Sequence, residues 1–182
     1  PDNVQEHPVE RIAHRTSPTN IGLSLLSGLA AHDFGYLTLG ELIARTGATL
    51  DTMDRLERHQ DHFLNWYDTQ TLQPLRPRYV STVDSGNLAG HLLTLRAGLR
   101  QLADAPPQWQ RLFDGLRDTL RLLQAHAPDD PPGSPTARFA ALLDDALART
   151  AHTPASLRTD FDAMARCATD VAATLVPSAQ HR

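Results

Sequence analysis

The sequence of 182 residues contains no lysine, and its 17 strongly basic residues are all arginines. The absence of lysine excludes a Schiff-base amine and the phosphate-binding lysine of a P-loop within this chain. The single cysteine, Cys167, excludes an internal disulfide and a cysteine zinc site, and we expect a buried, unreactive thiol on a helix. His59 and His62 form a pair at a helix end, but no third ligand stands at a recognisable spacing. Neither a metal site nor a cofactor is predicted.

Charge and hydropathy exclude two more classes of protein. The formal net charge is −4, which gives no field that attracts nucleic acid or an anionic membrane surface, so no nucleic-acid partner is expected. The longest mostly apolar stretch, 21–31, is too short to span a bilayer. The chain begins at Pro1 with residues typical of a loop inside a domain, and we expect a piece of a longer polypeptide.

Apolar residues recur at helical spacing along most of the chain, which predicts an all-α fold. Ser17 is expected to cap a helix whose first residue is Pro18. Thr38 and Glu41 match a capping box, and Gly47 is expected to end the short helix that follows. Further helices are predicted around Leu50–Leu56 and over 85–104, 107–126, 136–151 and 154–174.

Helicity breaks near 62–84, where Pro74 and Pro77 forbid a helix. Residues 79–83 are β-like, so we expect an irregular segment or hairpin, then a helix that begins within about two residues of Ser85. A simple bundle and an α/α toroid both fit this order, and the long polar, aromatic loop favours the toroid, because bundles usually have short connections. The predicted parts are a leading loop 1–16, helices with a cleft loop 17–128, a proline-rich connection 129–135 and two further helices 136–182.

Aromatic and polar side chains gather around this break in helicity. Three of the five tyrosine and tryptophan residues, Trp66, Tyr67 and Tyr79, lie within it. Their rings can stack on the apolar faces of sugars, or they can anchor an irregular loop in the core, and the sequence leaves both open. Asp84 and Ser85 stand where a helix begins, so they can hold sugar hydroxyls beside free N–H groups or can simply cap the helix.

Carboxylates suited to catalysis are scarce. Asp68 and Asp84 are the loop carboxylates close to the aromatic cluster, but nothing in the sequence fixes the separation that glycoside cleavage requires. Only four glutamates are present, and none is a convincing general acid. Hydrogen bonding to ligand hydroxyls is therefore favoured for these aspartates, and no catalytic residue is assigned.

Two long strings, HRTSPTNIGL at 14–23 and NWYDTQTLQPLRPRYVSTVDSGNLAGHL at 65–92, resemble the cyclic β-1,2-glucan synthase family. These are large bacterial membrane-associated enzymes. In that family a glycosyltransferase part extends the glucan, a glucoamylase-like (α/α)6 domain closes the ring by transglycosylation, and a phosphorylase-like domain trims chain length. The stretch resembles the early part of the glucoamylase-like domain over residues 1–100, and beyond Ala105 only a helical pattern is shared.

The resemblance implies that the loops at 1–20 and 62–87 line a glucan-binding cleft and that the ring-closing carboxylates lie beyond Arg182. The segment alone is then inactive, its partners are a β-1,2-glucan chain and the remaining domains, and its parent is anchored at the cytoplasmic face of the bacterial inner membrane. A related α/α-toroid β-glucan glycosidase or phosphorylase is the first alternative, and a non-enzymatic helical interaction module with an apolar groove is the second. The expected substrate-binding residues are Arg15, Thr16, Ser17, Asn20, Trp66, Tyr67, Asp68, Tyr79, Asp84, Ser85 and Asn87.

Overall fold

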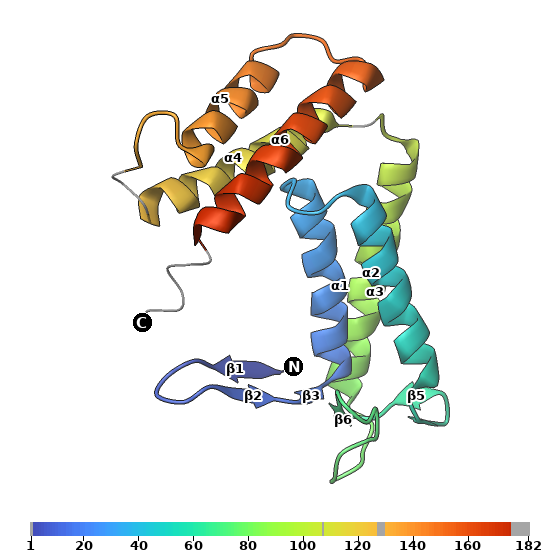
Figure 1. Ribbon diagram of the computed structural model, residues 1–182. Helices are drawn as coiled ribbons and strands as arrows, with labels where there is room; N and C mark the ends of the chain where they lie inside the picture. The colour runs from blue at the N-terminus through green and yellow to red at the C-terminus, as the bar shows by residue number, and fades with distance from the viewer. Residues whose placement is uncertain (1, 107, 127–129, 176–182) are drawn as a thin grey trace. The chain divides into compact units, whose positions relative to one another are not determined.

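The computed structural model describes residues 2–106, 108–126 and 130–175, and it confirms the all-α prediction. Six helices and six strands of two or three residues lie in these ranges (Figure 1). None of the described helices combines the length and hydrophobicity that crossing a bilayer requires. The chain divides into two compact units, one formed by Pro1–Asp33 with Leu37–Pro107 and the other by Phe34–Tyr36 with Gln108–Arg182.

The first unit contains α1 (Pro18–Asp33), α2 (Leu39–Arg55) and α3 (Thr82–Asp104). The start of α1 agrees with the sequence, because the Ser17 hydroxyl oxygen accepts a 3.2 Å hydrogen bond from the Asn20 backbone N–H. The capping box of α2 is confirmed, since Thr38 Oγ1 accepts from the Glu41 N–H and the Glu41 carboxylate accepts from the Thr38 N–H. Both starts rest on contacts within three residues, which is why local sequence predicts them.

Two predicted helix boundaries in this unit are wrong. α2 continues through Gly47 to Arg55, because its buried face continues past a single glycine, which weakens a helix without ending it. α3 begins at Thr82, three residues before Ser85, and its cap is Ser81, whose hydroxyl oxygen accepts a 3.1 Å bond from the Asp84 N–H. Several residues in the string 81–85 are good caps, and the first of them is used. The β-like expectation for 79–83 is also wrong, since no strand forms there and 82–83 are helical.

The α1 and α3 helices run parallel and pack closely, with α2 antiparallel to both (Figure 1). Gly22 on α1 faces His91 on α3, and Gly98 on α3 faces Leu29 on α1, so the facing residues advance together along both helices. A parallel pair begins at the same end, which brings the first turns of α1 and α3 together. The core of this unit is formed by Ile21, Leu25, Met53, Leu56, Leu64, Tyr67, Leu88 and Leu95.

Short strands shape the segments outside the helices of this unit. The leading loop, expected to be irregular, contains an antiparallel hairpin of β1 (Asn3–Gln5) and β2 (Arg11–Ala13). The segment near 62–84 is irregular and contains short strands. An irregular segment was one of the two forms that the sequence predicts here, the other being a hairpin. The strand pairs are β3 (Arg15–Thr16) with β6 (Tyr67–Asp68) and β4 (Arg58–His59) with β5 (His62–Phe63).

The two histidines of the candidate metal pair stand on a hairpin and not at a helix end, which corrects that expectation. His59 on β4 faces His62 on β5 across a tight turn. Gln60 and Asp61 form this turn with φ of 49° and 66°, and a local left-handed turn of this kind is what a two-residue hairpin requires. Within the described ranges no group of three or more histidine, cysteine or acidic side chains could hold a metal ion.

The second unit contains α4 (Trp109–His126), α5 (Pro135–Leu147) and α6 (Pro154–Leu175). These helices agree with the predicted stretches to within a few residues, although part of the proline-rich connection lies outside the described residues. Ser134 caps α5 by accepting a 3.0 Å bond from the Ala137 N–H. The predicted burial of Cys167 is confirmed, and its thiol donates to the Pro135 carbonyl at 3.1 Å. The core is formed by Phe113, Leu120, Phe139, Leu143, Ala146, Leu157, Met164 and Cys167.

The packing of α1 on α3 predicts that Gly22→Ala destabilises the chain by about 1–3 kcal/mol, the usual cost of overpacking a tight interface. The added Cβ would lie 2.9 Å from the Cβ of His91, which is fixed to its backbone. Gly90→Ala on α3 is the matched control, because its Cβ meets nothing within 4 Å and alanine favours the helix by up to about 1 kcal/mol. Urea unfolding followed by far-UV circular dichroism measures both, and equal stability of the two variants would contradict the close packing.

Candidate functional site

The pairing of β3 with β6 gives the site two different faces. Arg15 is opposite Asp68 and Thr16 is opposite Tyr67. Tyr67 turns into the core, where it is fully buried, whereas Trp66, which directly precedes β6, is partly exposed. The Arg15 guanidinium carbon lies 4.8 Å from the centre of the Trp66 ring, as a diagonal pair on one face. A partly exposed indole and a cation therefore lie together on the outer face.

Asp2 joins this outer face to the start of α1. Its carboxylate accepts bonds of 3.0 and 2.9 Å from Arg15 Nε and Nη2, and one of 3.0 Å from Asn20 Nδ2. The hydrogen bond from Asn20, followed by that from Arg15, lowers the pKa of Asp2 below its ordinary value. Sequence reasoning missed Asp2, since its partners are 13 and 18 residues away and no local motif marks it.

The first turn of α3 is tied to the first turn of α1 by a second set of polar contacts. Thr19 Oγ1 donates a 2.6 Å hydrogen bond to Asp84 Oδ1, and Asn87 Nδ2 donates a 3.1 Å bond to Thr19 Oγ1. Thr19 and Asn20 are neighbours, so the two sets of contacts meet at the start of α1. We call the whole set the N-terminal polar cluster; its members are Asp2, Arg15, Thr19, Asn20, Trp66, Asp84 and Asn87.

Tyr67 corrects one sequence expectation, because its ring is fully buried and has no face open to a ligand. Its hydroxyl donates a 2.7 Å bond to the Glu57 carbonyl and accepts a 2.8 Å bond from the Leu64 N–H. Burial raises the pKa of the phenol, which keeps its proton for the bond to Glu57. Of the two interpretations left open by the sequence, core anchoring holds for this residue.

The other residues expected to bind substrate lie in a turn, at helix starts or on the exposed surface. Asp68 Oδ1 accepts 2.8 Å bonds from the Gln70 and Thr71 N–H groups and so closes a turn. Ser17 is buried and used as a cap, and the Asp84 and Ser85 side chains lie inside the first turn of α3, where neither is the cap. Tyr79 is exposed. Thr16 and Asp68 border a cavity of about 350 Å³ that also touches α2 through Thr49, Thr52 and Met53, and Leu56 just beyond that helix.

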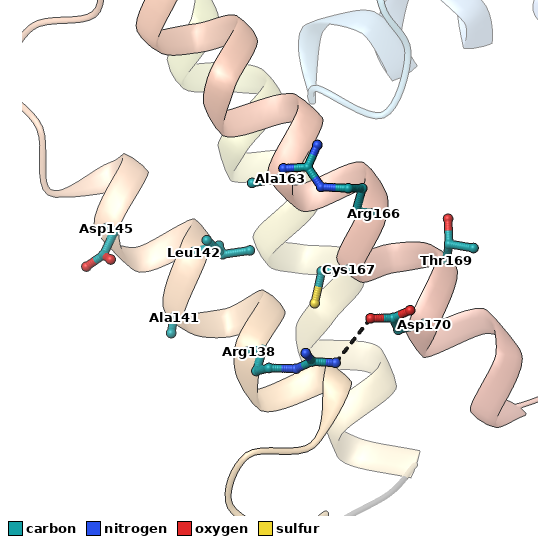
Figure 2. Close-up of a pocket in the computed structure, with 9 residues that line it drawn as sticks. All are labelled: Arg138, Ala141, Leu142, Asp145, Ala163, Arg166, Cys167, Thr169 and Asp170. Atoms are coloured by element: carbon teal, nitrogen blue, oxygen red, sulfur yellow. Dashed lines mark hydrogen bonds and ion pairs between the residues drawn. The ribbon is translucent and has the colours of Figure 1, made fainter.

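The second unit has a shallow groove of about 810 Å³ between α5 and α6 (Figure 2). Arg138 and Asp170 close one part of it with an ion pair of 3.1 Å. The sulfur of Cys167 lies beside this pair, while Asp145 is directed away from α6 (Figure 2). The charged groups of the groove do not converge on one point, so it offers no arrangement for chemistry, and no sequence signal had marked it.

The chemistry available in the N-terminal polar cluster is hydrogen bonding and stacking. The Asp2 carboxylate is held by Arg15 and Asn20, and that of Asp84 accepts from Thr19. Each carboxylate is thus already a hydrogen-bond acceptor within the cluster, and neither is assigned an acid or nucleophile role. Amide and hydroxyl groups beside an indole suit a polar ligand without charge.

The chain was compared with known proteins, and no protein-family model matches it. It is 46% identical over 134 residues to the cyclic β-(1,2)-glucan synthase NdvB of Rhizobium meliloti (strain 1021). The match covers 71% of this chain and 5% of that relative, so the chain spans a small part of the relative's length.

The burial of Tyr67 predicts that Tyr67→Phe costs about 1–3 kcal/mol in the free energy of unfolding, because the Leu64 N–H and the Glu57 carbonyl lose their buried partner. Tyr79→Phe removes the same atom from an exposed ring and is expected to leave stability unchanged. Chemical denaturation of the two variants measures the difference. A Tyr67→Phe variant as stable as Tyr79→Phe would show that the hydroxyl is not an anchor.

The turn closed by Asp68 predicts a contribution to stability that depends on pH. Backbone hydrogen bonds from Thr71 and Gln70 lower the pKa of Asp68 below 3.8, so the contribution is present above the unfolded pKa and is lost as the pH falls through the folded pKa. We expect Asp68→Asn, which keeps an oxygen acceptor, to lose less stability than the original chain between pH 5 and 3. Asp51→Asn on exposed α2 surface is the control, and identical acid profiles for all three chains would contradict the assignment.

Proposed function

This chain belongs, as a segment spanning 5% of its relative's length, to the cyclic β-(1,2)-glucan synthase family, and we propose that it supplies part of a glucan-binding surface. The domain that contains this surface closes the glucan ring by transglycosylation in the parent enzyme. It has an (α/α)6 fold like that of glucoamylases, and this segment forms its early part.

The observation that carries the proposal is the N-terminal polar cluster at the shared start of α1 and α3. In an α/α toroid the inner helices are parallel, and the loops that precede them lie on one side of the ring. The parallel α1 and α3, with α2 returning antiparallel between them in sequence, fit an inner–outer–inner order (Figure 1). The substrate surface then comprises Arg15, Thr16, Asn20, Trp66, Asp68, Tyr79, Asp84, Ser85 and Asn87, with Ser17 and Tyr67 supporting it from below.

The charges of the cluster favour a neutral ligand. The first turns of two helices present free N–H groups and positive dipole ends, which attract anions. Here the carboxylates of Asp2 and Asp84 already occupy that environment. An anionic ligand would meet these carboxylates, whereas sugar hydroxyls can donate to them and accept from Asn87. A glucan has this chemistry.

The ring-closing chemistry belongs to another part of the parent. The carboxylates of Asp2 and Asp84 accept hydrogen bonds from Arg15, Asn20 and Thr19, which supports a binding role for them. The acid and nucleophile of glycosyl transfer are contributed by other parts of the parent. The partners of the segment are the glucan chain and the remaining domains, and its reaction needs no cofactor. The parent acts at the cytoplasmic face of the bacterial inner membrane.

A helical docking module is the second candidate, and one observation favours it. An apolar groove of about 270 Å³ lies in the second unit. The groove is lined by Leu116, Thr119, Leu120, Leu123, Phe139, Ala168, Val171 and Ala172.

A related toroid glycosidase or phosphorylase that acts on β-glucans would share the binding surface of the first unit. It would differ in the catalytic groups that other parts of the parent supply.

The proposal predicts that the 182-residue chain binds linear β-1,2-glucan but neither cyclises nor shortens it, because it has a binding surface without an acid and nucleophile pair. Isothermal titration calorimetry measures binding, and mass spectrometry of the glucan after incubation measures turnover. Asn87→Ala is expected to weaken binding several-fold, as loss of a ligand hydrogen bond of about 1 kcal/mol would do.

Gln101→Ala, on the exposed far half of α3, is the matched control and is expected to bind like the original chain. A β-1,3-glucan of similar length is the control ligand. Absence of binding by a folded chain would overturn the proposal, and cyclic or shortened products would show that catalytic carboxylates lie within the segment.

A further inference from the structure

The Trp66 ring is the aromatic surface best placed for a sugar, yet a positive charge already lies on it. Trp66 stands between the buried Asn65 and Tyr67, and its own side chain is partly exposed on the outer face of the ribbon. The Arg15 guanidinium is 4.8 Å from the ring centre, well within the range of a cation–π contact. One face of an indole cannot accept a guanidinium and a pyranose ring together.

Arg15 is held in this position by Asp2 from one side. Two nitrogens of the guanidinium donate to the same carboxylate oxygen, Oδ2, at 3.0 and 2.9 Å. The other oxygen, Oδ1, accepts from Asn20, which fixes the carboxylate to the first turn of α1. Asp2 is thus fixed independently of Arg15, and it would keep one partner if Arg15 moved away.

The Arg15 side chain is free to leave. It is 52% exposed, and water can replace both the carboxylate and the ring as its surroundings. Exposed ion pairs are weak, so the covering position is easily exchanged. If the ion pair were buried, departure of the guanidinium would leave the carboxylate charge buried without a partner, which is costly.

Resting on the proposed function, we infer that Trp66 is a stacking subsite for one glucose unit, that Arg15 covers this subsite when no glucan is bound, and that Asp2 holds Arg15 in the covering position. A glucan that stacks on Trp66 displaces the guanidinium into water. Arg15 then opposes glucan binding at this subsite, although its guanidinium lies over the Trp66 ring that forms the subsite. Its role is opposite in sign to that of an arginine that donates hydrogen bonds to the ligand.

The inference predicts that Arg15→Ala binds linear β-1,2-glucan about two- to five-fold more tightly than the original chain, the size of an exposed cation–π contact. Asp2→Asn is expected to change affinity in the same direction by less, because the asparagine keeps an acceptor for Asn20 and loses the charge that holds Arg15. Both are prepared with Trp109→Phe, which leaves Trp66 as the one tryptophan, so that its emission reports on the ring directly. Circular dichroism confirms that each variant is folded.

Arg78→Ala and Glu57→Gln are the matched controls, since they break an exposed ion pair of 3.0 Å elsewhere in the same unit. Neither is expected to alter affinity or Trp66 emission. In the chain without glucan, Arg15→Ala and Asp2→Asn should each change Trp66 emission. The double variant Arg15→Ala with Trp66→Leu should lose the gain in affinity.

The outcomes separate the two proposals. Weaker glucan binding by Arg15→Ala, with Asn87→Ala still weakened, makes Arg15 a ligand contact and overturns the covering role while the glucan surface stands. Unchanged Trp66 emission in ligand-free Asp2→Asn overturns the role of Asp2. Absence of glucan binding in the original chain and in every folded variant overturns the proposed function, and the subsite with it.

Discussion

The contact of α1 with α3 through Gly22 and Gly98 is the constraint on which the rest of the first unit depends. Two parallel helices that carry no Cβ at these points can approach until Thr19 reaches Asp84, at 2.6 Å. A wider spacing would leave the same side chains on two separate helix ends. The polar cluster is therefore a consequence of close helix packing about one and three turns further along α1, and its geometry is only as firm as that packing.

The sequence predicts those features of this chain whose causes are local. Ser17 and the Thr38–Glu41 box act within three residues, and both starts were predicted from the sequence. Long-range causes were missed: Asp2 binds residues 13 and 18 positions away, and Tyr67 is buried because β3 pairs with β6. The stop at Gly47 failed for a similar reason, because burial of the α2 face outweighs the weak helix propensity of one glycine. Of the members of the polar cluster, Asp2 and Thr19 were absent from the expected set, which did include Arg15, Asn20, Trp66, Asp84 and Asn87.

Parallel helices that begin side by side have an electrostatic cost that explains the composition of the cluster. Their positive dipole ends lie together, whereas antiparallel neighbours would place opposite ends side by side. Asp84 in the first turn of α3 and Asp2 beside the first turn of α1 offset that field. The chain has no lysine that could neutralise these carboxylates with a flexible charge. The partners of the two carboxylates are the Asn20 amide, the Thr19 hydroxyl and the Arg15 guanidinium. The result is a surface of fixed donors and acceptors with little unbalanced charge, which is the surface that a polyhydroxyl ligand needs.

Trp66 and Tyr67 are neighbours at the start of β6, and their side chains lie in opposite environments. The Tyr67 hydroxyl bonds the buried Leu64 N–H and the partly buried Glu57 carbonyl, so its movement would leave the Leu64 N–H without a partner. Trp66 faces outward, and the contacts on it come from Arg15, which water can replace at little cost. The anchoring of Tyr67 on the inner face restrains the outer ring, because Trp66 directly precedes β6 in the chain. An indole held still from behind and covered by a removable cation can then be exposed to a ligand without any movement of the backbone.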